Sequence, residues 1–238
     1  MGKKAITLLA ALLLAAGAGL AAFPAASNWL ARRQAGQAMA RYNAVAQARQ
    51  ADYTALWADA EAYNRRLARA GGLGGAGIVS EELRDVSAYL NPLGTGLMGQ
   101  VEIPAIDVSL PIYQGTDEAA LQAGAGFWIG TSLPTGGPGT HCVLTAHNGL
   151  ARARLFTDLD RLEPGDTFTL TVLDRVMTYE VDQILVTEPE DLSPLAIRED
   201  KDYVTLYTCT PYGVNTHRLL VRGVRVQQDA GKEEAAHE

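Results

Sequence analysis

The chain opens with a long apolar stretch. From Ala5 to Ala26 it carries no charged residue, and a run of about 20 apolar residues is long enough to cross a bilayer as a helix. The pattern predicts a membrane anchor or signal segment over residues 1–26. A cleaved signal peptide is the alternative, because Ala16-Gly17-Ala18 fits a small-residue cleavage site. The length of the run favours an uncleaved anchor.

A second pattern, with a helical period, lies between residues 27 and 70. We expect one or two amphipathic helices here, which dock on the domain that follows or extend it from the membrane; a contact with a partner helix is the alternative. Five glycines between Gly71 and Gly77 then end the helical pattern, and they predict a flexible link within residues 71–88. The apolar stripe consists of Tyr53, Leu56, Trp57, Ala60, Tyr63 and Leu67.

Beyond Gly99 the apolar period changes to two. Short runs bounded by Pro and Gly are typical of an antiparallel barrel or sandwich. We also expect a short helix over residues 117–122, a hairpin turn at 173–176 and a long excursion over 188–199. The polar residues 227–238 predict a disordered tail. The expected strands cover residues 101–103, 108–113, 141–145, 167–173, 176–186, 203–209 and 218–226.

Composition narrows the class of protein. The 238 residues, 47% of them hydrophobic, suffice for one good-sized core with appendages. The formal net charge of −7 argues against a general nucleic-acid binder, which would carry a basic face. No phosphate loop or dinucleotide motif is present, and the histidines lack metal-ligand spacing, so the sequence predicts no cofactor and no metal.

The candidate chemistry lies between the last two expected strands. One strand ends at Cys209, Pro211 and Gly213 mark a loop, and the next strand begins at Arg218. If the two strands pair, the thiol and the guanidinium face one site. A cation favours the nucleophilic thiolate, and an arginine can hold an oxyanion. A buried structural cysteine beside a surface arginine is the alternative interpretation.

The string T-L-Y-T-C-T-P-Y-G-V-N-T-H-R-L-L-V-R-G around Cys209 resembles the active-site signature of sortases, in particular the class C, pilin-polymerising branch. The segment T-H-C-V-L-T-A-H-N-G-L resembles the sortase histidine segment and places His147 in the catalytic position. Further similarity in G-Q-V-E-I-P-A-I, L-P-I-Y-Q-G, G-T-S-L-P-T-G-G and L-F-T-D-L-D extends the resemblance over residues 89–226. It implies a closed antiparallel sortase-type β-barrel as the catalytic domain.

The resemblance also implies a reaction. Cys209 would attack an LPXTG-like sorting signal to form a thioacyl enzyme, His147 would transfer protons and Arg218 would hold the oxyanion. The acceptor would be a pilin lysine, as in pilus assembly, or a cell-wall precursor amine, as in a housekeeping sortase. The enzyme would lie at the cell membrane, with one N-terminal span and an extracellular catalytic domain. A secreted cysteine hydrolase and a non-catalytic surface-binding barrel are the alternatives from other classes.

Two further features follow from the resemblance. The excursion over residues 188–199 would wall the substrate groove, with four candidate contacts that could equally be packing residues: Leu192, Pro194, Leu195 and Ile197. Class C sortases carry an Asp-Pro-aromatic lid over the cysteine, but Gly77, Ile78 and Val79 stand at that place here. We therefore expect a weak, mobile or absent lid and a more exposed Cys209, with Ser80 capping a short acidic helix that follows.

The remaining cysteine and histidines receive structural interpretations. A Cys142 to Cys209 disulfide is the first possibility for two cysteines in an exported chain. Under the resemblance the two lie about five residues out of step on neighbouring strands, and at about 3.3 Å per residue this exceeds a disulfide's Cα reach of about 7 Å. Cys142 is then a core residue. We expect His217 to support a loop, and His141 and His237 to be packing or surface residues.

Overall fold

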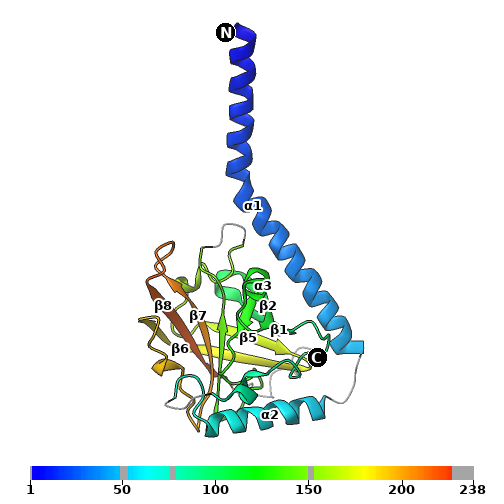
Figure 1. Cartoon of the computed structure of the whole chain (residues 1–238), viewed down its shortest axis with the longest axis vertical. Helices are drawn as coiled ribbons and strands as arrows, with labels where there is room; N and C mark the ends of the chain where they lie inside the picture. Colours follow the sequence, from blue (N-terminus) through cyan, green and yellow to red (C-terminus); the bar gives the residue numbers. More distant parts are fainter. Residues whose placement is uncertain (1, 49–52, 76–78, 150–152, 227–238) are drawn as a thin grey trace, which may run out of the picture.

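An eight-stranded barrel with a long helix leaving one end makes up the computed structural model, which describes residues 2–48, 53–75, 79–149 and 153–226 (Figure 1). Gly77, Ile78, His237 and the expected disordered tail lie outside the described residues. The barrel closes in the order β1-β2-β3-β4-β7-β8-β6-β5. Its strands are β1 Leu97–Ile103, β2 Val108–Gln114, β3 Ala125–Phe127, β4 Thr140–Thr145, β5 Thr167–Val172, β6 Arg175–Thr187, β7 Asp202–Thr210 and β8 His217–Arg225.

The expected closed β-barrel is confirmed, with two differences in detail. Most neighbouring strands are antiparallel, but β2 pairs with β3 and β4 pairs with β7 in parallel. Strand β3 was not expected, because its three residues are all buried and therefore show no alternation. The expected hairpin turn is present, since β5 and β6 join through Leu173 and Asp174.

Strand β7 is buried on both faces. Val204 and Leu206 belong to the main core, whereas Tyr207 belongs to a smaller cluster with Leu195, which lies in the expected excursion. Successive side chains of a strand point to opposite faces. Cys209 therefore shares the face of Tyr207, outside the main core.

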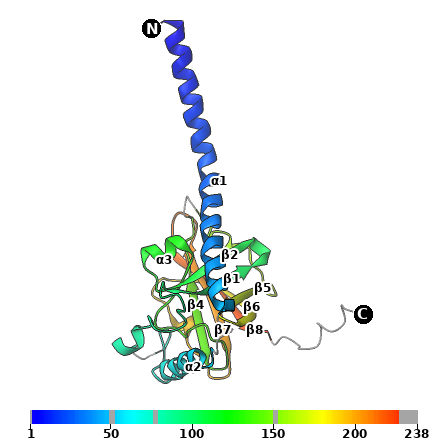
Figure 2. The same ribbon diagram turned by 90° about the vertical axis from the view of Figure 1, so that its right-hand side faces the viewer.

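Helix α1 (Lys3–Ala48) runs unbroken through the expected boundary at residues 26 and 27, and Pro24 lies inside it. Its first half is exposed, and its second half lies along the barrel over β1 and β2 (Figure 2). Arg32 pairs with Asp107 at 2.8 Å. The buried Tyr42 hydroxyl donates to the Met98 carbonyl at 2.5 Å and accepts from the Leu173 amide at 2.8 Å. The anchor and the docked helix are thus one element.

Helix α2 (Thr54–Arg69) crosses the opposite end of the barrel (Figure 1). It buries Trp57, Ala60, Tyr63 and Leu67 of the predicted stripe, so the expected docking is observed. Two polar bonds fix the helix to the barrel: Trp57 Nε1 donates to Asp174 at 2.8 Å and Asn64 Nδ2 donates to the Leu133 carbonyl at 3.0 Å.

The described part of the glycine-rich link is packed rather than flexible. The Leu73 amide donates to the Gly130 carbonyl at 2.8 Å. A Cβ on Gly74 would lie 2.3 Å from the Ala196 nitrogen and 2.4 Å from the Leu195 carbonyl carbon. The composition was misleading here, because glycine also permits close approach of two backbones.

Short helices complete the domain: α3 Glu118–Ala123 and the 3₁₀ helices η1 Glu81–Arg84, η2 Pro104–Ile106, η3 Leu159–Arg161 and η4 Ser193–Leu195. Asp117 caps α3 by accepting from the Ala120 amide at 2.9 Å. Ser80 stands at the N-cap position of η1, but its side chain makes no capping bond there.

His141 and Cys142 both lie in the interior, as expected. Cys142 is a free, buried thiol whose pKa is raised by burial. The His141 ring is fully buried, 2.7 Å from Thr205 Oγ1 and 3.1 Å from the Ala196 carbonyl. Burial lowers the pKa of His141 from 6.5 to about 4. The imidazole is therefore neutral in the folded protein at pH 7.

This lowered pKa predicts an acid-sensitive contribution to stability. The unfolded chain binds the proton more tightly, so the contribution is complete above pH 6.5 and is lost as the pH falls toward 4, by about 3 kcal/mol in total. We expect His141→Gln to remove this component from the pH profile of the unfolding free energy, measured with denaturant. An unchanged slope between pH 6.5 and 4 in the variant would contradict the assignment.

Candidate active site

Cys209 and Arg218 face each other across β7 and β8. Cys209 is the penultimate residue of β7, and it pairs directly with Arg218 in the antiparallel register. Directly opposite residues have Cβ atoms about 5 Å apart on the same face of a sheet. The structure therefore brings together the thiol and guanidinium that the sequence placed at one site, and leaves Cys209 half-buried.

The Arg218 guanidinium is held by backbone carbonyls. Its Nη1 donates to Asn215 at 3.0 Å and to His217 at 2.9 Å. Burial raises the pKa of the Tyr207 phenol, and the neighbouring Arg218 charge opposes that rise. No carboxylate forms an ion pair with Arg218 in the described part of the chain. Its charge is therefore free to favour a thiolate or an oxyanion.

His147 reaches the same end through the parallel pairing of β4 with β7. The register places Thr145 opposite Tyr207, and the same offset, continued two residues beyond the strand, places His147 beside Cys209. Two bonds extend the contact past the end of β4: the Ala146 amide donates to the Tyr207 carbonyl at 3.3 Å, and Thr208 Oγ1 donates to the Ala146 carbonyl at 2.7 Å.

The ring of His147 has an unused nitrogen. Its Nε2 atom is buried and makes no hydrogen bond to the described residues, although the side chain as a whole is 34% exposed. The Glu118 carboxylate lies 4.0 Å away, beyond hydrogen-bond distance. Buried polar atoms are rarely left without a partner. The atom is thus available for proton exchange with a bound ligand.

Asn148 is a further site residue, which the sequence did not single out. Its Nδ2 donates to the Cys209 carbonyl at 2.8 Å, while its Oδ1 is buried and makes no bond within the described residues. The contact ties the histidine segment to the cysteine strand. The only sequence signal was its place directly after His147, because an asparagine in a loop ordinarily indicates a turn.

His217 does not face the thiol. It pairs with Thr210 in the β7–β8 register, one position away from the Cys209 pair. Its Nε2 lies 3.3 Å from Glu188, and its Nδ1 lies 2.9 Å from the Thr216 hydroxyl. These contacts connect the β7–β8 loop with the start of the excursion, in keeping with the expected role in loop support.

The four candidate groove residues separate into two places. Leu195 is buried in the small cluster with Tyr207, Val143 and Leu220, and Leu192 packs against it. This cluster lies on the face that carries Cys209 and Arg218. Ile197 instead packs on the main core, near Gly72. Pro194 is half-buried in η4.

Of the lid-equivalent residues, the structure describes Val79. It is buried and lines a cavity of about 530 Å³ together with Leu73, Arg84 and Trp128. Trp128 in turn contacts Tyr207, with ring centroids 4.8 Å apart. Val79 therefore lies near Trp128, which contacts the cysteine-bearing face through Tyr207. The weak, mobile or absent lid over Cys209 stays a prediction.

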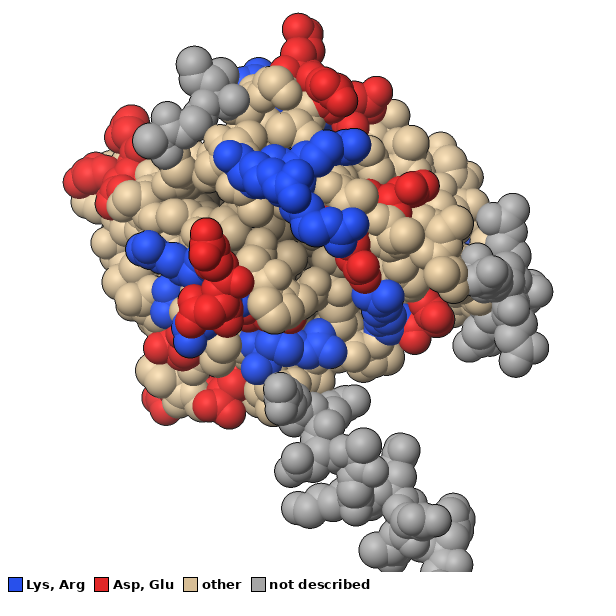
Figure 3. All heavy atoms as spheres, turned by 90° about the horizontal axis from the view of Figure 1, so that it is seen from below, with Lys and Arg blue, Asp and Glu red and all other residues tan. Residues whose placement is uncertain are grey.

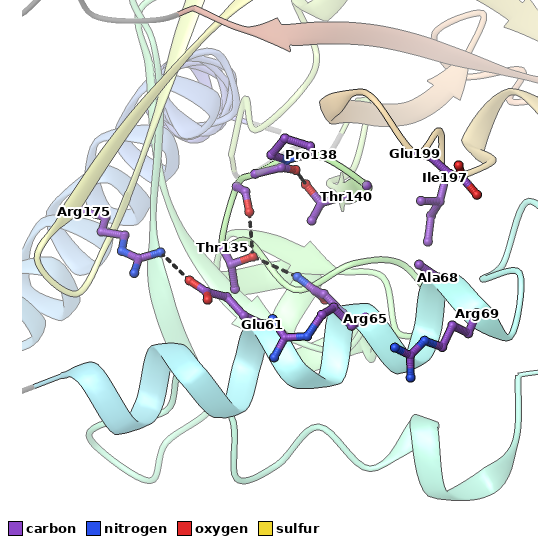
Figure 4. Close-up of a pocket in the computed structure, with 14 residues that line it drawn as sticks. Glu61, Arg65, Ala68, Arg69, Thr135, Pro138, Thr140, Arg175, Ile197 and Glu199 are labelled. Carbon is purple, nitrogen blue, oxygen red and sulfur yellow. Dashed lines mark hydrogen bonds and ion pairs between the residues drawn. The ribbon is translucent and has the colours of Figure 1, made fainter.

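A larger cavity, of about 680 Å³, lies at the other end of the barrel, between α2 and the loop before β4 (Figure 4). Arg65, Arg69 and Arg175 line it, and Figure 3 shows Lys and Arg side chains interspersed with Asp and Glu over this end of the molecule. Glu61 pairs with Arg175 at 3.0 Å. The cavity includes Ile197 but none of the three catalytic candidates, so it gives no support to a reaction there.

Comparison with known proteins matches the barrel to one family. A family model described as "Sortase domain" matches residues 101–226. Sortase D of Bacillus subtilis (strain 168) is 30% identical over 131 residues, which are 54% of this chain and 63% of that protein. The chain covers less than two-thirds of the length of the curated relatives it matches.

Solved structures match over more of the chain. Sortase C1 from Streptococcus agalactiae has a TM-score of 0.76 at 44% identity, with 81% of this chain and 100% of that chain covered. A sortase C from Streptococcus pneumoniae, whose description refers to catalysis and pilin substrate specificity, has a TM-score of 0.68 at 45% identity, with coverage of 78% and 94%.

The Asn148 contact yields a testable expectation. Asn148→Ala removes the bond to the Cys209 carbonyl and loosens the placement of the thiol relative to His147, so we expect kcat of any reaction that depends on Cys209 to fall by about 10-fold or more, with KM little changed. Steady-state kinetics and a thermal unfolding curve measure the two effects separately. An unchanged kcat in the folded variant would show that the bond does not position the thiol.

Proposed function

Because this chain belongs to the sortase family, whose domain model covers residues 101–226, we propose that it is a cysteine transpeptidase acting on LPXTG-like sorting signals. The observation that carries the proposal is the direct pairing of Cys209 with Arg218, next to a His147 segment bonded to the same strand. A nucleophile, a proton carrier and a fixed cation then surround one position.

The first half-reaction forms a thioester. The Cys209 thiolate attacks the threonine carbonyl carbon of the sorting signal, and the carbonyl oxygen becomes an oxyanion beside Arg218. The peptide C–N bond breaks, the leaving amine takes a proton from His147, and the threonine carbonyl remains bonded to sulfur. The unused Nε2 of His147 supports this role.

The second half-reaction reverses the proton transfer. An acceptor amine loses a proton to His147 and attacks the thioester, the C–S bond breaks, and the thiolate of Cys209 is restored. The new amide joins the two proteins. A cysteine hydrolase would use water at this step, so formation of product only with an amine distinguishes the two reactions.

We propose a pilin lysine as the acceptor, which makes the product an isopeptide-linked pilus. Support comes from the sortase C1 of S. agalactiae and from the sortase C of S. pneumoniae, whose description names pilin substrate specificity. One observation favours the alternative, a housekeeping sortase that uses a cell-wall precursor amine: Gly77, Ile78 and Val79 stand where class C sortases carry the lid triplet.

We further propose that α1 anchors the enzyme in the cell membrane, with the barrel outside. Among the described residues, α1 is the one helix long and apolar enough to cross a bilayer, and its apolar part is not buried against the barrel. The continuation of the same helix into its docked half supports an anchor over a cleaved signal peptide. The single span and the extracellular barrel follow from this assignment.

The thioacyl step has a direct test. We expect mass spectrometry of the full chain incubated with an LPXTG peptide to show an adduct equal to the peptide truncated after threonine, present in the wild type and absent in Cys209→Ala. Cys142→Ala serves as the matched control and should keep the adduct, because that thiol is buried in the core. No adduct across a panel of sorting motifs, with Cys209 reduced and reactive, would refute the transpeptidase proposal.

The cation at the site has its own test. We expect Arg218→Lys to lower kcat/KM by about 10²-fold, since the lysine keeps the charge but loses the planar donors that a developing oxyanion needs. Arg222→Lys is the control, because Arg222 lies on the same strand and pairs with Asp182. Equal losses in both variants would assign the effect to the strand rather than to the oxyanion.

A further inference from the structure

The catalytic end of the barrel and the apolar part of α1 lie on the same side of the molecule. In Figures 1 and 2 the β7–β8 loop is at the end of the barrel from which the exposed half of α1 emerges, whereas α2 covers the opposite end. The apolar run of α1 ends at Ala26, where the polar residues Ser27 and Asn28 follow. The next contact of the helix with the barrel, at Asn28, is only about 3 Å further along the helix axis.

A series of hydrogen bonds connects this part of α1 with the active-site rim, which is the end of the barrel that carries Cys209, His147 and Arg218. Asn28 Oδ1 accepts from the Arg154 amide at 3.1 Å, and the Phe156 amide donates to the His147 carbonyl at 3.1 Å. The described residues of the loop after His147 thus connect His147 with the part of α1 where the apolar run ends. Gly149 in that loop lies under the Tyr212 ring, which an added Cβ would approach to 2.9 Å.

The active-site rim exposes apolar side chains at the end of the barrel from which the apolar part of α1 emerges. Among the described barrel residues, four large hydrophobic side chains are strongly exposed, and three of them lie at this end: Val186, Tyr212 and Val214. Val186 pairs with Leu219 beside the Arg218 pair, and the other two lie in the β7–β8 loop. The fourth, Val176, pairs with Thr171 at the far end of β6.

The residues of α1 next to Asn28 also fit a membrane boundary at this point of the helix. Trp29 is 61% exposed and its ring lies 5.5 Å from the Arg33 guanidinium. Exposed Trp beside Arg directly after an apolar span is typical of the bilayer interface. The boundary therefore passes close to Asn28, and so close to the loop that follows His147.

We propose that the active-site rim rests on the outer surface of the membrane that holds α1, with Tyr212 and Val214 inserted at the headgroup level. This inference rests on the proposed membrane anchor. The catalytic residues then open toward the lipid surface, where the acylation step meets sorting signals that emerge from the bilayer. Glu118 and Glu188 lie at the same end, so the contact is apolar rather than electrostatic, and it should not require anionic lipid.

A depth measurement on the full chain tests the proposal. In a Cys209→Ala background, Cys142 stays buried and unlabelled, so single cysteines can carry an environment-sensitive fluorophore at three exposed positions. Val214→Cys probes the rim (64% exposed), Val176→Cys the far end of the barrel (51%) and Leu13→Cys the apolar helix (66%). Each protein is reconstituted in phosphatidylcholine vesicles that contain lipids with nitroxides at the headgroup or deep in the acyl chain.

Three results are expected without any substrate. The probe at position 13 loses its fluorescence to the deep nitroxide, the probe at 214 loses most of its fluorescence to the headgroup nitroxide, and the probe at 176 is unaffected by either. The same pattern should hold with phosphatidylglycerol added and at high salt, because burial of an apolar side chain is not screened.

The outcomes separate the two proposals. Quenching at position 13 without quenching at 214 overturns rim docking and leaves the anchor standing. No quenching at 13 refutes the anchor itself. A change in the fluorescence of the probe at 214 that appears only when a sorting peptide is added, without quenching by either nitroxide, would assign the exposed side chains to substrate contact and would overturn the membrane contact.

Discussion

The pairing of β7 with both of its neighbours is the constraint on which the active site depends. On one side the parallel register with β4 places Thr145 opposite Tyr207, and on the other the antiparallel register with β8 places Arg218 opposite Cys209. A slip of one residue would turn Cys209 toward the main core and away from Arg218. The geometry of the site is therefore a property of the sheet, and the loops complete what the registers fix.

Local pattern was sufficient for much of this arrangement. Alternation over β7 and β8, with Pro211 and Gly213 between them, predicted both strands and the placement of Cys209 and Arg218. Periodicity along a chain carries no information on which distant strands become neighbours, so the parallel pairing of β4 with β7 was not predicted from the residues. The position of His147 came from family resemblance, and the structure adds the Asn148 contact that supports it.

One boundary and the flexibility of one link differed from expectation for physical reasons. The change from apolar to amphipathic composition near residue 26 marks a change of surroundings, and the helix continues through it because its backbone bonds are independent of what covers its surface. The glycines after α2 suggested freedom, but Gly74 serves for its small size. Composition shows which conformations and contacts a segment allows, whereas packing in the folded protein determines which of them are adopted.

The excursion between β6 and β7 contacts both the cysteine-bearing face and the end of the barrel covered by α2. Leu195 packs under Tyr207 on the cysteine-bearing face, and only two residues later Ile197 lines the cavity beside α2. Gly74 packs closely against the backbone of Leu195 and Ala196, which lies between the Leu195 and Ile197 side chains. A force that pushed the Leu195 side of this segment outward would have to displace the Ile197 side as well, so the contact with α2 stiffens the segment that carries Leu195.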